Sequence, residues 1–189
     1  MKKDLIAISI VLSILISFPF ISGCSKENKN TISDESYYKY IAFAVNNSIY
    51  NIWNQNIAGH PSGDKHIEAE SAYGGSVTIN GNVNADQSTN IDTFDLVFSF
   101  SNYKHLYTNK NNNSSGHIII TGNLSLKGSQ SSSYNSSKYK SSSLQITGII
   151  NKGNAERTIN ESGEYGLTSN TENEKTTAEG IIFGKTISW

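Results

Sequence analysis

The feature that most constrains this fold is an alternation of apolar and polar residues along much of the chain. It runs through residues 77–83, 94–100, 118–126 and 144–150, and a final apolar run occupies 180–189. In a β-strand successive side chains point to opposite faces, so each alternating run has one buried face and one hydrated face. The pattern therefore predicts an antiparallel sheet.

One segment before these runs has a helical period instead. Ser33 is a suitable N-cap, and Asp34 and Glu35 place carboxylates in the first turn, where they favour the helix dipole. Gly59 and Pro61 then end the segment. Apolar residues recur between them at three- and four-residue steps and form one stripe: Tyr38, Ile41, Val45, Ile49 and Ile52. We expect one helix that packs on the sheet through this stripe.

Turn-like segments rich in Asn, Ser and Gly separate the expected strands, at residues 84–90, 107–116, 128–143 and 151–154. They are too short to carry crossover helices, so the strands should follow one another up and down. The predicted class is α+β, mainly β: one N-terminal helix packed on a curved antiparallel β-meander, which forms either a half-barrel or an open sheet.

Three glycines recur at equivalent places in this pattern. Gly81, Gly122 and Gly148 each come two residues after an isoleucine that points inward, so the glycines point inward as well. Glycine within a strand marks a bend or a close approach of two backbones. We expect a groove for the helix combined with curvature of the sheet; three unrelated, tolerated glycines are the alternative.

The first 23 residues have the layout of an export signal. Lys2 and Lys3 precede an uncharged apolar run at residues 5–21, which is followed by the small residues Ser22 and Gly23. The run is at the short edge of the roughly 20 residues that a membrane-spanning helix needs. It is therefore expected to be removed.

The segment Ile21-Ser22-Gly23-Cys24 resembles the lipobox of bacterial lipoproteins, which the lipoprotein signal peptidase recognises. The resemblance covers this segment only. It implies cleavage before Cys24 and attachment of diacylglyceryl and N-acyl groups to it, so that fatty acids such as palmitate anchor the protein in a membrane of the cell envelope. Ser25 in place of Asp resembles outer-membrane lipoproteins, which favours the outer membrane where two exist. An ordinary signal peptide followed by a free thiol is the alternative.

These segments define the expected organisation: a signal peptide at 1–23, a lipidated cysteine and polar tether at 24–32, and one helix-plus-sheet domain at 33–189. The mature chain would have 166 residues, enough for one core. The formal net charge of the whole chain is −1, and Arg157 is the sole arginine. No basic field is present to attract nucleic acid.

The strongest polar pattern is His66, Glu68 and Glu70, which would share one face of an extended strand. With His60 and Asp64 nearby, they are weak candidates for ligands of a metal such as zinc. Alternating charged residues are also common on the hydrated face of an edge strand, and no established metal-motif spacing is present. We therefore predict no metal site and no other cofactor.

The remaining candidates for chemistry are isolated. Ser137 and Lys140 have the spacing Ser-x-x-Lys, but they lie in a serine run without a helix signal. His105 and His117 flank an Asn-rich segment and are expected on the surface. No nucleophile elbow, phosphate loop or dinucleotide fingerprint is present. We predict no catalytic residue and no enzyme.

The aromatic residues of the helical segment allow two interpretations. Tyr37, Tyr40 and Trp53 fall partly off the apolar stripe, so they could line a ligand site or stack on sugars. More often such residues cover the rim of a small core, which is the interpretation that we favour.

Three functions remain open. The first is a non-enzymatic binding module at the membrane, which contacts an envelope protein or surface component through loops at 104–116 and 128–143. The second is a carrier of an apolar ligand or lipid in a half-barrel lined by residues 94–100. The third is a metal-assisted hydrolase that uses His66, Glu68 and Glu70. A cavity between the helix and the Phe94 to Phe100 face would favour the carrier, and a filled interior would favour the binding module.

Overall fold

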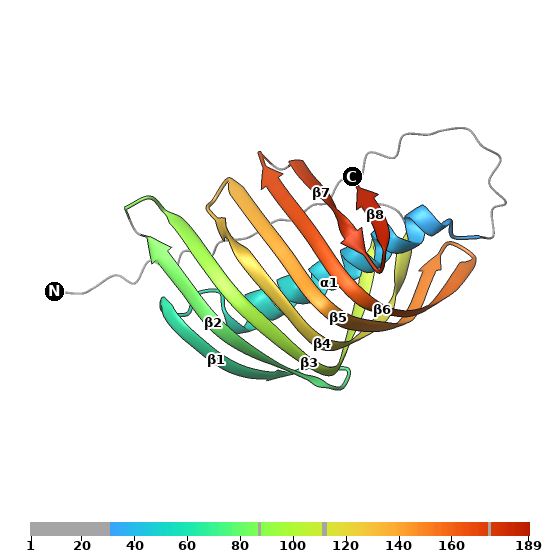
Figure 1. Cartoon of the computed structure of the whole chain (residues 1–189), viewed down its shortest axis with the longest axis horizontal. Helices are drawn as coiled ribbons and strands as arrows, with labels where there is room; N and C mark the ends of the chain where they lie inside the picture. The colour runs from blue at the N-terminus through green and yellow to red at the C-terminus, as the bar shows by residue number, and fades with distance from the viewer. Residues whose placement is uncertain (1–30, 87, 111–112, 174) are drawn as a thin grey trace.

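The computed structural model describes residues 31–86, 88–110, 113–173 and 175–189 (Figure 1). The expected signal peptide and Cys24 lie outside these residues. Within them one helix precedes eight strands, which pair antiparallel in chain order: α1 (Asp34–Asn56), β1 (Gly63–Glu70), β2 (Ser76–Asp86), β3 (Ile91–Asn109), β4 (Ser114–Gln130), β5 (Tyr134–Lys152), β6 (Ala155–Glu172), β7 (Lys175–Ile182) and β8 (Lys185–Ser188). The predicted class, mainly β with one helix on an antiparallel meander, is confirmed.

The sheet is open and strongly curved, and α1 lies across its hollow side (Figure 1). The helix contacts β1 and β8, which are the two edge strands, as well as β3 and β4. It therefore closes the gap that the unpaired edges leave. Within the described part of the chain, no helix has the length and apolar character needed to cross a membrane.

The strands are longer than the sequence pattern predicts. Strand β3 continues to Asn109, and β4 begins already at Ser114. The serine run belongs to β5 from Tyr134 onward. The predicted loops at 107–116 and 128–143 are therefore wrong for most of their length. The serines can form strands because the neighbouring strands on both sides pair with their backbones.

The helix begins and ends as predicted but is buried on more than one side. Ser33 is the N-cap and accepts a hydrogen bond from the Ser36 amide, while Gly59 follows the C-terminus with φ 77°. Seven consecutive residues, 40–46, are buried, so no single stripe describes the contact. The curved sheet surrounds the helix at these residues, whereas Lys39, Asn47 and Asn54 keep polar side chains partly or fully exposed elsewhere along it.

The core is formed by the inward side chains of the sheet and by the helix. Phe98, Ile120 and Ile146 from three neighbouring strands are fully buried, as are Ile41 and Ile52 of α1. Burial of one such side chain stabilises the fold by about 1.5–3 kcal/mol. The helix is therefore part of the core of the domain.

The three recurrent glycines explain the curvature. Gly81, Gly122 and Gly148 have φ of 136°, 109° and 146°, values that side-chain-bearing residues rarely adopt. A Cβ atom on Gly81 would lie 2.1 Å from the Asp95 carbonyl oxygen on the next strand, and one on Gly148 would lie 2.1 Å from the carbonyl oxygen of His117. The nearest atoms belong to neighbouring strands and not to α1, so the contacts support the predicted curvature and give no support to a helix groove.

Candidate functional site

Apolar side chains occupy the space between α1 and the concave side of the sheet. Ile41, Val45 and Phe98, which would border the cavity of a carrier, are fully buried and belong to one continuous core. The crevice beside the helix has a volume of about 30 Å³. One water molecule needs about 10–15 Å³ of such space, whereas small-molecule pockets hold roughly 300–1,000 Å³. The concave side is therefore filled by α1.

This crevice lies between the C-terminal half of α1 and the ends of β3 to β6. Its apolar part comes from Ile49, Trp53, Phe94 and Leu126, and Trp53 packs edge-to-face on Phe94 with 5.1 Å between ring centroids. Its polar part consists of amides and hydroxyls: Asn46, Gln130, Asn135, Ser137, Ser169 and Thr171. None of the described side chains that line it is charged.

Hydrogen bonds hold part of this polar lining in place. Tyr139 Oη donates to Oδ1 of Asn46, and Ser137 Oγ donates to Oδ1 of Asn135 at 2.7 Å. Burial raises the pKa of the Tyr139 phenol, so the hydroxyl remains protonated and stays a donor. Gln130 is 7% exposed, and its side-chain amide makes no hydrogen bond among the described residues.

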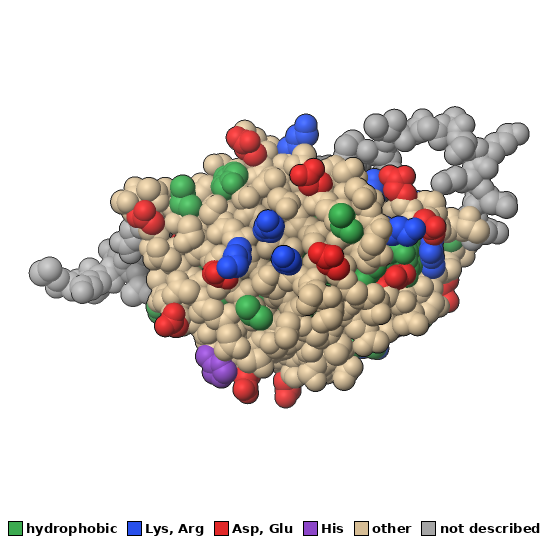
Figure 2. Space-filling view, viewed as in Figure 1, with side chains coloured by type: hydrophobic (Ala, Val, Ile, Leu, Met, Phe, Trp, Pro, Cys, Tyr) green, Lys and Arg blue, Asp and Glu red, His purple; other side chains and the backbone are tan. Residues whose placement is uncertain are grey.

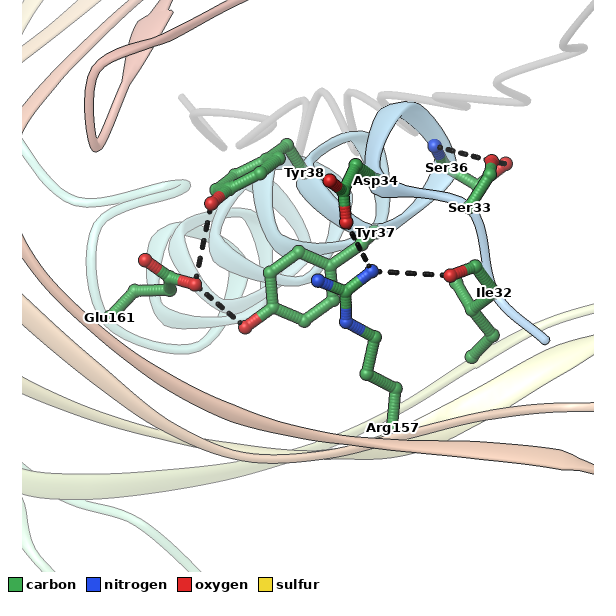
Figure 3. Close-up of polar contacts among 8 residues, drawn as sticks. All are labelled: Ile32, Ser33, Asp34, Ser36, Tyr37, Tyr38, Arg157 and Glu161. Carbon is green, nitrogen blue, oxygen red and sulfur yellow. Dashed lines mark hydrogen bonds and ion pairs between the residues drawn. The ribbon is translucent and has the colours of Figure 1, made fainter.

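A second cluster joins the start of α1 to β6 (Figure 3). The guanidinium of Arg157 lies over the Tyr37 ring, 3.7 Å from its centroid, and donates to the Ile32 carbonyl oxygen at 3.1 Å. It also forms an ion pair with Asp34 at 2.8 Å. Glu161 Oε1 accepts from the Tyr37 hydroxyl at 2.9 Å. We call these five residues the helix clamp; it holds the point at which the N-terminal segment enters the domain.

Burial of the Tyr37 hydroxyl raises its pKa, and the hydrogen bond to the Glu161 carboxylate raises it further. The phenol therefore stays protonated and continues to donate to Glu161. Of the helical aromatics, Tyr37 belongs to the clamp, Tyr40 is buried in the core and Trp53 lines the crevice. The sequence did not indicate Arg157 or Glu161, since nothing local shows that their strand meets the helix.

No family model, curated protein or solved structure matches this chain.

The candidate metal ligands do not converge. His66, Glu68 and Glu70 lie on the exposed face of β1, and Nδ1 of His66 is 2.7 Å from Oδ1 of Asn80 on the next strand. Among the described residues, no three His, Cys, Asp or Glu side chains are placed to hold a metal ion. Ser137 is buried and Lys140 exposed, and their odd spacing along β5 puts them on opposite faces.

The expected exposure of His105 is wrong. Its side chain is 6% exposed, and Nε2 lies 2.8 Å from Oδ1 of Asn47 on α1. The register of β3 shifts between Phe100 and Tyr103, so inward positions change from even to odd numbers and His105 turns inward. Burial lowers the pKa of His105 to about 4. His117, on the neighbouring strand, is partly exposed.

The convex face of the sheet has a different character from the crevice. Figure 2 shows Lys, Asp and Glu side chains of both signs intermixed among neutral ones. Lys127 forms an exposed ion pair with Asp95 at 2.7 Å, and Lys138 is its cross-strand neighbour. Mixed charge of this kind favours solubility and creates no field of one sign that would steer a charged partner.

Proposed function

We propose that this chain is a lipid-anchored lipoprotein of the bacterial cell envelope, and that its domain binds a partner at the membrane surface without catalysis. The anchor would be the diacylglyceryl and N-acyl groups on Cys24. More than one acyl chain is needed for stable attachment, since a single chain gives marginal, reversible binding. The partner would be an envelope protein or another surface component.

The observation that carries the binding proposal is the position of α1 inside the curved sheet. The helix is buried along 42–46 and at Ile49 and Ile52, and the crevice beside it holds about 30 Å³. A carrier of lipid or another apolar ligand would need a cavity of several hundred Å³ in the same place. The filled interior therefore favours surface recognition over transport of an enclosed ligand.

The placement of the two clusters also supports this proposal. The clamp lies at the first turn of α1, next to the segment that would lead to the anchor, whereas the crevice begins at Asn46. Twelve residues separate Asp34 from Asn46, which corresponds to about 18 Å along the helix axis. An anchored domain would thus present the crevice away from the point where the tether enters.

The metal-assisted hydrolase is not favoured by any contact among the described residues. Its three side chains are exposed on an edge strand, and His66 is engaged with an amide. A site of this kind needs convergent ligands and a position for substrate.

The anchor is tested by replacing Cys24→Ser and following processing, incorporation of labelled palmitate and membrane fractionation. We expect the variant to lose the label and leave the membrane fraction, while a Ser25→Ala control keeps both. Crosslinking in intact cells should then recover an envelope component with the anchored protein. Unchanged labelling and fractionation of Cys24→Ser would refute the anchor, and repeated failure to crosslink any component would refute the binding role.

A further inference from the structure

The crevice combines features that point to one class of ligand. Two of its three amide residues are more than nine-tenths buried, since Asn46 is 6% and Gln130 is 7% exposed. The Oδ1 atom of Asn46 is used by Tyr139, but its Nδ2 has no acceptor among the described residues. Gln130 likewise has no partner there. Neither amide is among the described buried polar atoms that lack a hydrogen-bond partner, so both reach the solvent of the crevice, where a ligand group could replace water.

The third amide extends this array toward the mouth of the crevice. Asn135 accepts from Ser137 through Oδ1, which leaves its Nδ2 without a partner among the described residues. Gln130 and Asn135 are directly opposite each other on β4 and β5, and Ser137 is opposite Ser169 on β6. Amide donors and hydroxyl groups thus lie side by side across three strands. This arrangement suits a ligand whose groups both donate and accept hydrogen bonds.

The surroundings of the amides restrict the chemical class of the ligand further. No charged side chain is found in the described lining, so the site offers nothing to compensate an ionic group. The rings of Tyr50 and Trp53 lie on the helix side and provide apolar surface next to the polar array. A neutral molecule with several hydroxyls and an apolar C–H face fits this combination. Saccharides have this chemistry.

The backbone excludes a peptide that binds as an added strand. Such a peptide needs an unpaired strand edge. In the crevice Gln130 is paired on both sides, with Asp92 and Asn135, and Ser169 is paired with Ser137 and Ala178. Recognition in the crevice must therefore come from side chains.

We propose that the crevice binds a neutral saccharide, which inserts one hydroxyl or hydroxymethyl group between Asn46, Gln130 and Asn135. The volume of about 30 Å³ admits a group of this size, while the sugar ring lies at the mouth against Tyr50. This inference rests on the proposed binding function and names its partner as a surface glycan.

The test uses full-length protein purified in detergent. The chain has two tryptophans, so a Trp189→Phe background leaves Trp53 as the sole tryptophan, and its fluorescence reports on the crevice. Glucose, galactose and N-acetylglucosamine are titrated in turn, with N-acetylalanine methylamide as a neutral peptide probe. We expect a saturable change with at least one sugar and a dissociation constant on the order of 1 mM, as suits a small ligand with few contacts.

Two variants identify the site. Gln130→Leu and Asn135→Leu should each weaken sugar binding at least fivefold, and Asn135→Leu is decisive if Gln130→Leu does not fold. The matched control Asn123→Ala removes an exposed amide from the convex face of the same sheet and should leave the affinity unchanged. Saturable binding lost in both crevice variants supports the proposal. No saturable change with any sugar, an undiminished affinity in Asn135→Leu, or a response to the peptide probe alone would overturn it.

These outcomes are separable from those of the proposed function, because sugar binding in detergent does not depend on lipid at Cys24. A negative titration together with palmitate labelling and a crosslinked envelope protein would overturn the saccharide site and leave the anchored binding module in place.

Discussion

The guanidinium of Arg157 on β6 stacks over the ring of Tyr37 on α1, 3.7 Å from the ring centroid (Figure 3). The two residues are far apart in the sequence, and their contact joins the start of the helix to a strand near the end of the chain. The same guanidinium holds the Ile32 carbonyl oxygen, so one side chain fixes both the helix and the segment that precedes it.

Replacing Arg157→Ala should lower the free energy of unfolding by about 1–2 kcal/mol, through loss of the cation–π contact and of the hydrogen bond to Ile32. The ion pair adds little, because the Asp34 side chain is 75% exposed. Urea denaturation measures the change. Lys127→Ala, which removes an exposed ion pair, is the control and should cost less than about 1 kcal/mol. Equal losses in the two variants would show that the stacking contributes nothing.

His105 should make folding stability depend on pH in the acid range. Burial lowers the pKa of His105 to about 4 in the folded state from 6.5 in the unfolded state, so the unfolded chain binds more protons between these values. Stability from this group is present above pH 6.5 and is lost as the pH falls toward 4. The loss between pH 7.5 and pH 5 should be about 2 kcal/mol.

Denaturation curves at both pH values measure this effect in the wild type and in His105→Gln. In the variant, the difference in the free energy of unfolding between pH 7.5 and pH 5 should be smaller by about 2 kcal/mol. The control His66→Gln changes an exposed histidine on β1 and should keep the wild-type difference. If His105→Gln loses as much stability between pH 7.5 and pH 5 as the wild type does, His105 is not the source of the pH dependence.

Two buried tyrosines should respond in opposite ways to loss of the hydroxyl. Tyr139→Phe leaves Oδ1 of Asn46 without its donor, which should destabilise the protein by about 1–3 kcal/mol. Tyr165 is fully buried and its hydroxyl has no partner among the described residues, so Tyr165→Phe should be neutral or stabilising. Thermal unfolding compares the pair, and a large loss in Tyr165→Phe would reveal a partner such as an ordered water.

Sheet curvature should be sensitive to a methyl group at the recurrent glycines. Gly148→Ala places Cβ against the His117 carbonyl oxygen at φ 146°, and the expected loss is about 2–4 kcal/mol. The control is Gly153→Asn in the β5–β6 turn, where φ is 57° and nothing lies within 4 Å of the added Cβ. Asparagine tolerates this left-handed conformation, so the control should lose no more than about 1 kcal/mol. Similar losses at both positions would contradict a special role for Gly148.

Local chemistry accounts for the parts of the fold that could be predicted. Ser33 caps the helix through a contact within its own first turn, and the inward phenylalanines of β3 follow from strict alternation. The serine run of β5 was misassigned because serine favours turns in isolation, whereas here both neighbouring strands pair with it. His105 was misplaced because a bulge changes the parity of a strand without any sign in its composition.

The candidate site could be predicted only in fragments. For Trp53 the sequence left a ligand contact open and favoured the rim of the core. The amides of Asn46, Gln130 and Asn135 come from a helix and two strands and meet only after folding. The helix clamp could not be predicted either, because Arg157 and Tyr37 are far apart in the sequence and meet only after folding.

The amino-acid sequence by itself determined the helical period of α1, the alternation within parts of β2 to β5, the meander and the inward glycines, because these depend on neighbours within a few residues or on the nearest hairpin. Only the tertiary structure decided how far the sheet curls, that α1 fills its hollow, and which polar groups gather beside the helix. The physical reason is that small twists between neighbouring strands accumulate over the whole sheet. The resulting curvature decides which side chains, far apart in the sequence, lie next to one another.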